Sequence, residues 1–338
     1  MKISKSCFGP LRERNEKRDH GPLSLMTDGL SNMDARQERL GHFVERPRCP
    51  ICDGSAKRIV EMSFTEAPLR RYLEDFYSPQ GGVEFNFLEA TNYVLDRCVR
   101  CELIYQRNVP DQFLLHKLYE QWIDPGKVWE TYDRDRELAY YRDMAKEIET
   151  MMQLVGNSRP KVLDFGMGWG RWCRMAEAFE CNAFGCELSE ARVKHARSLG
   201  VKVIDMDDSE FGEFAFVNAE QVFEHLGEPL EILRRLREAL KPHGVIRVSV
   251  PNGNDIRRRL RRMDWSAAKG SPWSLNAVSP LEHVNCFANK SLRTLIERAG
   301  LRSLALGSAG RRTIRAAKDF ANALRRRTPG SLVVFAQK

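Results

Sequence analysis

Three glycines at alternate positions form the first candidate for a site with chemistry. They are Gly166, Gly168 and Gly170, in the run DFGMGWG that begins at Asp164. The run follows an apolar stretch typical of a strand, residues 162–165, and precedes residues with a helical apolar period. Glycines at such a junction permit a tight turn and let a ligand approach backbone N–H groups at the start of the helix. The sequence therefore predicts a ligand site at this turn.

The spacing of the glycines restricts the ligand. A dinucleotide fingerprint, Gly-x-Gly-x-x-Gly, needs its third glycine at position 171, which is Arg171, and a P-loop needs a Gly-Lys-Ser/Thr that does not follow. We therefore expect a nucleoside that lacks a pyrophosphate. Glu187 follows a second predicted strand, residues 183–186, where an acidic residue can accept hydrogen bonds from both ribose hydroxyls. The alternative is a glycine-rich turn with an exposed glutamate.

Two Cys-x-x-Cys pairs form the second candidate site. They are Cys49 with Cys52 and Cys98 with Cys101. Four thiolates in two such pairs are the usual ligands of a structural, tetrahedral zinc ion. The 45 residues between the pairs exceed the common zinc-ribbon spacing, so an insertion is implied. The alternative is four unrelated reduced cysteines.

The segments that must position these residues fall into four parts. Residues 1–46 lack a sustained apolar period and are expected to be a disordered basic tail. Residues 47–108 are expected to form a zinc-ribbon-like domain, and residues 109–158 a helical linker. Residues 159–338 alternate predicted strands and helices, which is typical of an α/β fold with a doubly wound, Rossmann-like sheet.

Composition and charge narrow the class of protein further. Hydrophobic residues make up 42% of the 338 residues and charged residues 30%, as in a soluble globular protein. We expect no membrane span, because no apolar run is long enough, and a cytoplasmic location, because nine cysteines occur without an apolar leader. Much of the net charge of +8 lies in two arginine runs, residues 257–262 and 311–327. Each run is either a solvated helix face or a contact for phosphate.

Several motifs taken together resemble class I S-adenosylmethionine (SAM)-dependent methyltransferases. The resemblance covers about residues 135–338 and is carried by DFGMGWG, Glu187, VFEHL at 222–226, LKPHG at 240–244 and VPNG at 250–253. One departure is Ala215, where the family often has an aspartate.

This resemblance implies roles for individual residues. Asp164 would orient the glycine turn and the methionine end of SAM. Gly166, Gly168 and Gly170 would give the cofactor room, and Glu187 would hold the ribose. The family usually places an acid near the adenine after the third strand, where this chain has Asp205 and Asp207, and we favour Asp207.

Two Glu-His pairs are the candidates for the methyl-transfer step. Glu224-His225 follows the fourth predicted strand, on the side where the resemblance places the methyl group, and Glu282-His283 lies where relatives close the acceptor pocket. A histidine with a pKa near neutral can take a proton from a hydroxyl, an amine or a carbon acid. His225 and His283 are therefore the predicted catalytic residues, and the alternative for each is a structural role in its turn.

The cysteine pairs resemble the zinc-binding region of deoxysugar C-methyltransferases and their relatives, which is a weaker likeness. We predict a SAM-dependent methyltransferase with structural Zn²⁺. The expected acceptor is a small molecule, or a precursor of a glycan or sugar nucleotide. In one form of this prediction the acceptor carries a phosphate group. Three alternatives stay open: an RNA methyltransferase, a non-catalytic SAM-binding protein, and a nicotinamide-dependent oxidoreductase, against which Arg171 argues.

Overall fold

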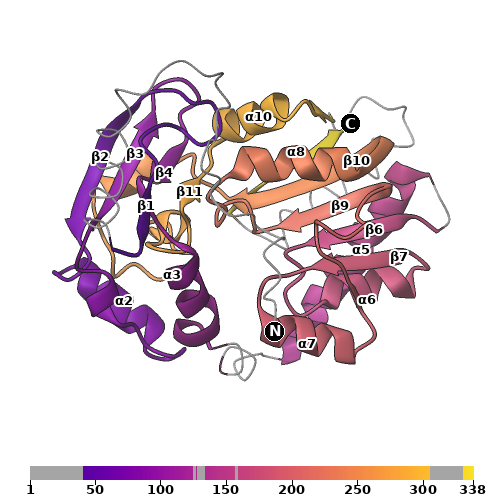
Figure 1. The fold of residues 1–338 in the computed structure, drawn as a ribbon, viewed down its shortest axis with the longest axis horizontal. Helices are drawn as coiled ribbons and strands as arrows, with labels where there is room; N and C mark the ends of the chain where they lie inside the picture. Colours follow the sequence, from indigo (N-terminus) through magenta and orange to yellow (C-terminus); the bar gives the residue numbers. More distant parts are fainter. Residues whose placement is uncertain (1–40, 125–126, 128–133, 157–158, 305–329) are drawn as a thin grey trace, which may run out of the picture.

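The computed structural model describes residues 41–124, 127, 134–156, 159–304 and 330–338. Most of the expected N-terminal tail and the whole second arginine run lie outside the described residues. The two main sheets lie side by side, a smaller one built mostly from the N-terminal half and a larger one built mostly from the C-terminal half (Figure 1). No helix in the described part of the chain is long and apolar enough to cross a bilayer.

The larger sheet has seven strands in the order β12-β13-β10-β9-β6-β7-β8. Strands β6 to β10 pair in parallel, while β13 runs antiparallel to β10 and β12 antiparallel to β13. Parallel strands are buried on both faces, so they read as nearly continuous apolar runs, as β9 does. The bounds are β6 (Lys161–Phe165), β7 (Asn182–Cys186), β8 (Lys202–Val203), β9 (Phe214–Glu220), β10 (Leu240–Pro251), β12 (Arg302–Ser303) and β13 (Ser331–Gln337).

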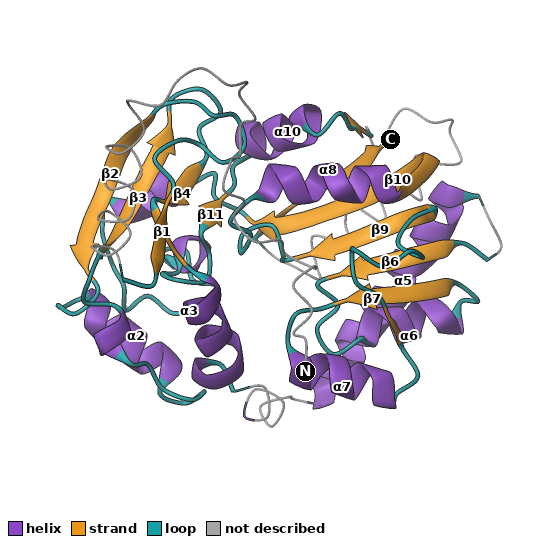
Figure 2. Ribbon diagram, viewed as in Figure 1, coloured by secondary structure: helices purple, strands orange, loops and turns teal. Residues whose placement is uncertain are grey.

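Helices cover both faces of this sheet (Figure 2). Because side chains alternate along a strand, Val162 and Phe216 pack with α5 and α6, while Leu163 and Val217 pack with α8 and α10. The bounds are α5 (Arg134–Val155), α6 (Arg171–Ala178), α7 (Glu190–Ser198), α8 (Pro229–Ala239) and α10 (Asn289–Arg298). The predicted doubly wound α/β fold is confirmed.

The smaller sheet is antiparallel and takes strands from both halves of the chain. Its order is β11-β4-β3-β2, and β11 (Asn285–Cys286) comes from the segment after β10. The other strands are β2 (Ala56–Ser63), β3 (Asn92–Cys98) and β4 (Ile104–Gln106), and a separate pair joins β1 (Phe43–Glu45) to β5 (Asn108–Pro110). The segment predicted as a zinc-ribbon-like domain therefore shares a sheet with the C-terminal half.

The core of the smaller sheet is shared in the same way. Leu69 and Leu73 of α2 (Leu69–Tyr77) belong to one buried cluster with Ile256 and Trp265 from the segment after β10. The remaining helical elements are α3 (Gln112–Lys117), the π-helical turn η2 (Leu118–Trp122), α9 (Ile256–Leu260), and the 3-10 turns η1 (Phe85–Phe87) and η3 (Asn276–Val278). Helix α3 begins at Asp111, whose carboxylate accepts a hydrogen bond from the Leu114 N–H at 2.8 Å.

Candidate active site

The three glycines form the turn between β6 and α6, and each has a positive φ: 77° at Gly166, 55° at Gly168 and 74° at Gly170. A Cβ at Gly166 would lie 2.5 Å from Cγ2 of Val222, so the turn packs directly on the loop after β9. A Cβ at Gly168 would meet no atom within 4 Å. The first glycine is therefore needed for close packing, whereas the second leaves open space beside the backbone.

The carboxylate of Glu187 points back at this turn. One oxygen accepts a hydrogen bond from the Gly168 N–H at 2.9 Å, and the other accepts from the backbone N–H groups of Leu188 and Ser189 at 2.9 and 3.0 Å. Glu187 follows β7, which pairs with β6, so the topology brings the acid and the glycines to one edge of the sheet. The predicted ribose-binding residue therefore lies beside the glycine turn.

Asp164 begins a chain of buried polar contacts across three neighbouring strands. Its Oδ1 accepts a hydrogen bond from Asn218 Nδ2 at 2.8 Å, and Asn218 Oδ1 accepts one from Arg247 Nη1 at 2.8 Å. Arg247 is 0% exposed and its Nε lies 3.5 Å from a carboxylate oxygen of Glu147 on α5. The side chain of Asp164 is thus held in place by a buried network that includes the charges of Arg247 and Glu147.

The two acids that follow β8 differ in their surroundings. The Asp207 side chain is 67% exposed and forms an ion pair with Arg235, at 2.6 Å between Oδ1 and Nη2. Asp205 is half-buried, and its backbone N–H donates to a carboxylate oxygen of Asp208 at 2.7 Å. Asp207 is therefore engaged with α8 in this structure.

His225 and His283 meet at the same end of the sheet. Their ring centroids lie 4.9 Å apart at an interplanar angle of 73°. His225 Nδ1 donates to the backbone carbonyl of Glu282 at 2.9 Å, and His283 Nδ1 donates to the carbonyl of Asn276. Since a carbonyl oxygen only accepts, each ring carries its proton on Nδ1 and keeps a lone pair on Nε2.

Glu224 is buried beside these rings. It is 1% exposed, and its Oε1 lies 3.8 Å from His225 Nε2. Neither carboxylate oxygen receives a hydrogen bond from another residue in the described part of the chain. Burial raises the pKa of Glu224 to about 8 and lowers the pKa of His225 to about 4. Burial also lowers the pKa of His283 well below its usual value, and the neighbouring His225 adds to this effect, so both imidazoles are neutral near pH 7.

Two tyrosines border this cluster. The Tyr119 hydroxyl lies 3.1 Å from His225 Nδ1, and the Tyr77 hydroxyl donates to a carboxylate oxygen of Glu282 at 2.9 Å. Both come from the N-terminal half, on η2 and α2. The surroundings of the two predicted catalytic histidines are therefore built jointly by the two halves of the chain.

A buried arginine from the N-terminal half binds the loops that carry the histidines. Arg46 donates to the carbonyls of Gln106, Val284 and Gly227 and to Oδ1 of Asn285, at 2.7 to 3.2 Å. Burial lowers the pKa of Arg46 to about 10. Val284 directly follows His283, so the guanidinium fixes the backbone next to a predicted catalytic residue.

Two further side chains, Gln106 and Asn285, add to the contacts of Arg46, and we call these three residues the Arg46 clamp. Gln106 Nε2 donates to the carbonyls of Ser279 and His283 at 2.9 and 3.1 Å. Asn285 Nδ2 donates to two carbonyls of the loop that carries His225, those of Phe223 and Leu226, at 3.1 and 2.6 Å. Together these three side chains tie β4 and the loops after β9 and β10 into one unit.

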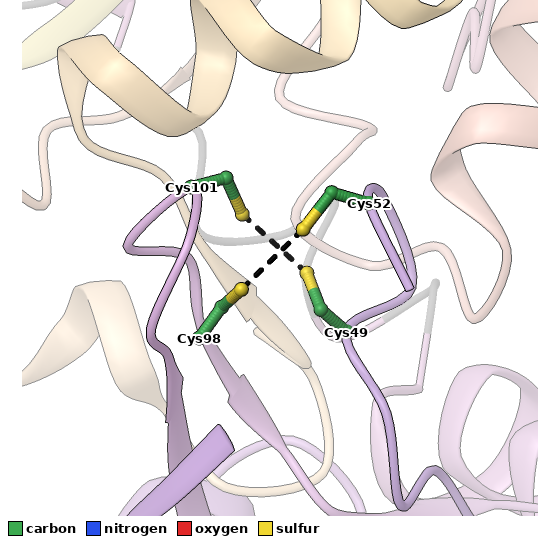
Figure 3. A group of neighbouring side chains, drawn as sticks. All are labelled: Cys49, Cys52, Cys98 and Cys101. Carbon is green, nitrogen blue, oxygen red and sulfur yellow. Dashed lines mark hydrogen bonds between the residues drawn. The ribbon is translucent and has the colours of Figure 1, made fainter. Parts of the chain in front are cut away.

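The four predicted metal-ligating cysteines come together and are all buried (Figure 3). The Sγ atoms of Cys49 and Cys101 lie 3.4 Å apart, as do those of Cys52 and Cys98. The hydrogen bond with the Cys101 thiol lowers the pKa of Cys49 to about 6. These four residues belong to the same buried cluster as Leu163 and Phe165 of β6, so the cluster adjoins the central sheet.

The first arginine run lies on and after α9. The guanidinium carbons of Arg258 and Arg262 lie 5.1 and 4.2 Å from the centre of the Trp273 ring, which is half-buried. Both arginines are exposed, as the solvated-face interpretation requires.

The chain is similar to known methyltransferases in sequence and in fold. A family described as "Methyltransferase domain" matches residues 132–306, and no curated protein matches the chain. Among solved structures, the plantazolicin methyltransferase BpumL in complex with SAH is 18% identical, covers 67% of this chain and 93% of its own, and has a TM-score of 0.47. A SAM-dependent methyltransferase from Mesorhizobium loti is 20% identical, with 56% and 95% covered and a TM-score of 0.39. One from Aquifex aeolicus is 19% identical, with 63% and 98% covered and a TM-score of 0.39.

Proposed function

Because the chain belongs to the methyltransferase family whose domain spans residues 132–306, and is a SAM-dependent methyltransferase, we propose that its acceptor is a small molecule or a glycan precursor. The family assignment overrules the alternative of a nicotinamide-dependent oxidoreductase. The observation that carries the proposal for the acceptor is the enclosure of the His225–His283 cluster. Tyr119, Tyr77 and the Arg46 clamp border it, which favours a compact acceptor group over a helical nucleic acid.

For the cofactor, we propose the residues at the carboxyl end of β6 and β7. Asp164 orients the turn, Gly166 and Gly170 shape it, Gly168 gives the ligand room, and Glu187 takes the ribose. SAM supplies an activated methyl group on a sulfonium, and the protein mainly aligns the acceptor with it. Gly168 supports this assignment because a Cβ there would meet no atom within 4 Å, which leaves space for a ligand, and because its N–H donates to the Glu187 carboxylate. We keep Asp207 as the candidate for the adenine end.

For acceptor activation, we propose His225 and His283. Each ring presents an unprotonated Nε2, because its Nδ1 donates to a carbonyl. The close packing of Gly166 on Val222 joins the glycine turn to the loop that carries His225. The cofactor turn and the histidines therefore meet at one edge of the sheet, as methyl transfer requires.

For the four cysteines, we propose structural Zn²⁺. Four thiolates arranged tetrahedrally at a Zn–S distance of about 2.3 Å lie about 3.8 Å from one another. The observed Sγ–Sγ distances of 3.4 Å are close to that value, and all four residues are buried. With all four ligand positions filled by protein, the ion would stabilise the junction of the two sheets and take no part in chemistry.

Two experiments test the proposed function. The first measures SAM binding by calorimetry for the wild type and for Glu187→Ala, with Glu190→Ala as a matched control, since Glu190 is exposed on the neighbouring α7. We expect at least a tenfold weaker Kd for Glu187→Ala only, since each 1.4 kcal/mol of lost binding is tenfold. Equal affinities for all three proteins would refute the cofactor assignment.

The second experiment follows transfer of a labelled methyl group from SAM into fractions of a cell extract. We expect the label in low-molecular-weight or glycan-precursor fractions, unchanged by ribonuclease treatment. Label that disappears with ribonuclease would replace the proposed acceptor with RNA.

A further inference from the structure

Three hydrogen-bond acceptors face one another in the proposed acceptor site. They are the Glu224 carboxylate, Nε2 of His225 and the lone-pair nitrogen of His283. One carboxylate oxygen of Glu224 and one ring nitrogen of each histidine lie within 4.8 Å of one another, and Glu224 Oε1 is 3.8 Å from His225 Nε2. Because both Nδ1 atoms donate to carbonyls, neither ring offers a proton to the space between the three groups.

Lys269 and Arg192 contribute positive charge near these groups, but among the described residues neither donates a hydrogen bond to the Glu224 carboxylate. Glu224 is 1% exposed, and its carboxylate oxygens receive no hydrogen bond from another residue among those described. A buried carboxylate without a donor is costly, so near pH 7 and without a cation this carboxyl group holds a proton. A divalent cation placed among the three groups would displace that proton and compensate the buried charge.

The surroundings of the histidines match those of metal ligands. A histidine that binds a metal through one nitrogen usually donates its other N–H to a carbonyl or carboxylate, which fixes the tautomer and the ring orientation. Both histidines have this outer hydrogen bond, to Glu282 and to Asn276. Two imidazoles and one carboxylate form a set that binds divalent transition metals and leaves positions open for a further ligand.

We propose that Glu224, His225 and His283 bind a divalent transition-metal ion, separate from the ion at the four cysteines. The proposal rests on the proposed function for its role: an acceptor oxygen would fill an open position on the ion, which would lower the pKa of that oxygen. In this proposal the two histidines would take part in the acceptor activation proposed above by holding the ion and not as general bases. The acceptor then needs an oxygen close to the atom that is methylated.

Cobalt(II) is a suitable probe, because thiolate-bound cobalt absorbs strongly through sulfur-to-metal charge transfer and cobalt bound by nitrogen and oxygen does not. The full chain, with its cysteine site first saturated with zinc, is titrated with Co²⁺ and followed by calorimetry and visible absorption. We expect one additional Co²⁺ per chain, with no thiolate band.

Variants locate the ion. Glu224→Gln keeps the shape of the side chain and removes its charge, and His225→Asn keeps a donor for the Glu282 carbonyl while removing Nε2. Each variant is expected to weaken Co²⁺ binding at least about tenfold. Replacing even a residue that only hydrogen-bonds to a metal ligand lowers metal affinity by about 10- to 100-fold. His243→Asn is the control, since His243 is exposed at the irregular start of β10 and asparagine tolerates its φ of 61°.

The wild-type stoichiometry is decisive even if a variant fails to fold. Absence of a second Co²⁺, or a second Co²⁺ that carries the thiolate band, overturns the proposal, as does wild-type affinity in both variants. SAM binding by the same wild-type sample separates this result from the proposed function. SAM bound without a second Co²⁺ refutes only the metal site, whereas absence of SAM binding refutes the proposed function itself.

Discussion

Replacing Arg46 with methionine tests whether the N-terminal half is an integral part of the catalytic site. The guanidinium is buried and donates to four groups, on Gln106, Val284, Gly227 and Asn285. Each buried acceptor that loses its donor costs about 1–3 kcal/mol, and breaking a buried charged cluster costs about 3–5 kcal/mol in total. We therefore expect the free energy of unfolding to fall by about 3–5 kcal/mol. At about 2 °C per kcal/mol for a chain of this size, Tm falls by about 6–10 °C.

The assay is urea denaturation of the zinc-loaded chain, with a thermal melt as a second measurement. Arg46→Lys is expected to recover little of the loss, because an ammonium cannot reach several carbonyls in the planar pattern of a guanidinium. Arg48→Met is the matched control. Arg48 is exposed and pairs with the exposed Asp53, so its loss is expected to cost less than about 1 kcal/mol. If Arg46→Met lowered the free energy of unfolding by less than about 1 kcal/mol, the conclusion that Arg46 holds the two halves together would be refuted.

Three further predictions concern the turn, the buried network and the cysteines. Gly166→Ala is expected to lower the free energy of unfolding by about 1–3 kcal/mol, because the residue has a positive φ and its Cβ would lie 2.5 Å from Val222. A decrease below about 0.5 kcal/mol in urea denaturation would contradict this close packing. Arg247→Met is expected to cost about 3–5 kcal/mol by the same assay, because it removes the guanidinium from a buried ionic network; an unchanged midpoint would show that the network is not stabilising. Cys98→Ser is expected to reduce bound zinc, which elemental analysis should find at about one ion per wild-type chain. Wild-type zinc content in that variant would remove the cysteines from the site.

The parts of the fold that were predictable from the sequence depend on local patterns. The strand before the glycine turn, the amphipathic face of α6 and the cysteine pairs each lie within a short stretch, where apolar period and spacing carry the information. The place of Glu187 after the second predicted strand led to the expectation of a ribose contact near the turn, and in the structure its carboxylate accepts a hydrogen bond from the Gly168 N–H. The glycine turn follows β6 and Glu187 follows β7, so their proximity can be predicted once these two strands are assumed to be neighbours.

The parts that were missed depend on contacts between distant residues. The hydrogen bonds of Arg46 join residues 60 to 239 positions apart, and no periodicity in these segments signals such a pairing. Strand β11 is two residues long, too short to recognise, yet it joins the C-terminal half to the smaller sheet. Arg247 could have been noticed as a charge inside the apolar run VIRVSV, since a buried arginine needs acidic or polar partners.

The central claim is that a nucleoside binds at the glycine turn with its ribose on Glu187. A crystal structure of the chain with S-adenosylhomocysteine tests it most directly. We expect the ribose hydroxyls to donate to the Glu187 carboxylate and the ligand to pass beside Gly168. A ligand bound elsewhere, with that carboxylate still accepting only from the backbone N–H groups of Gly168, Leu188 and Ser189, would contradict the account.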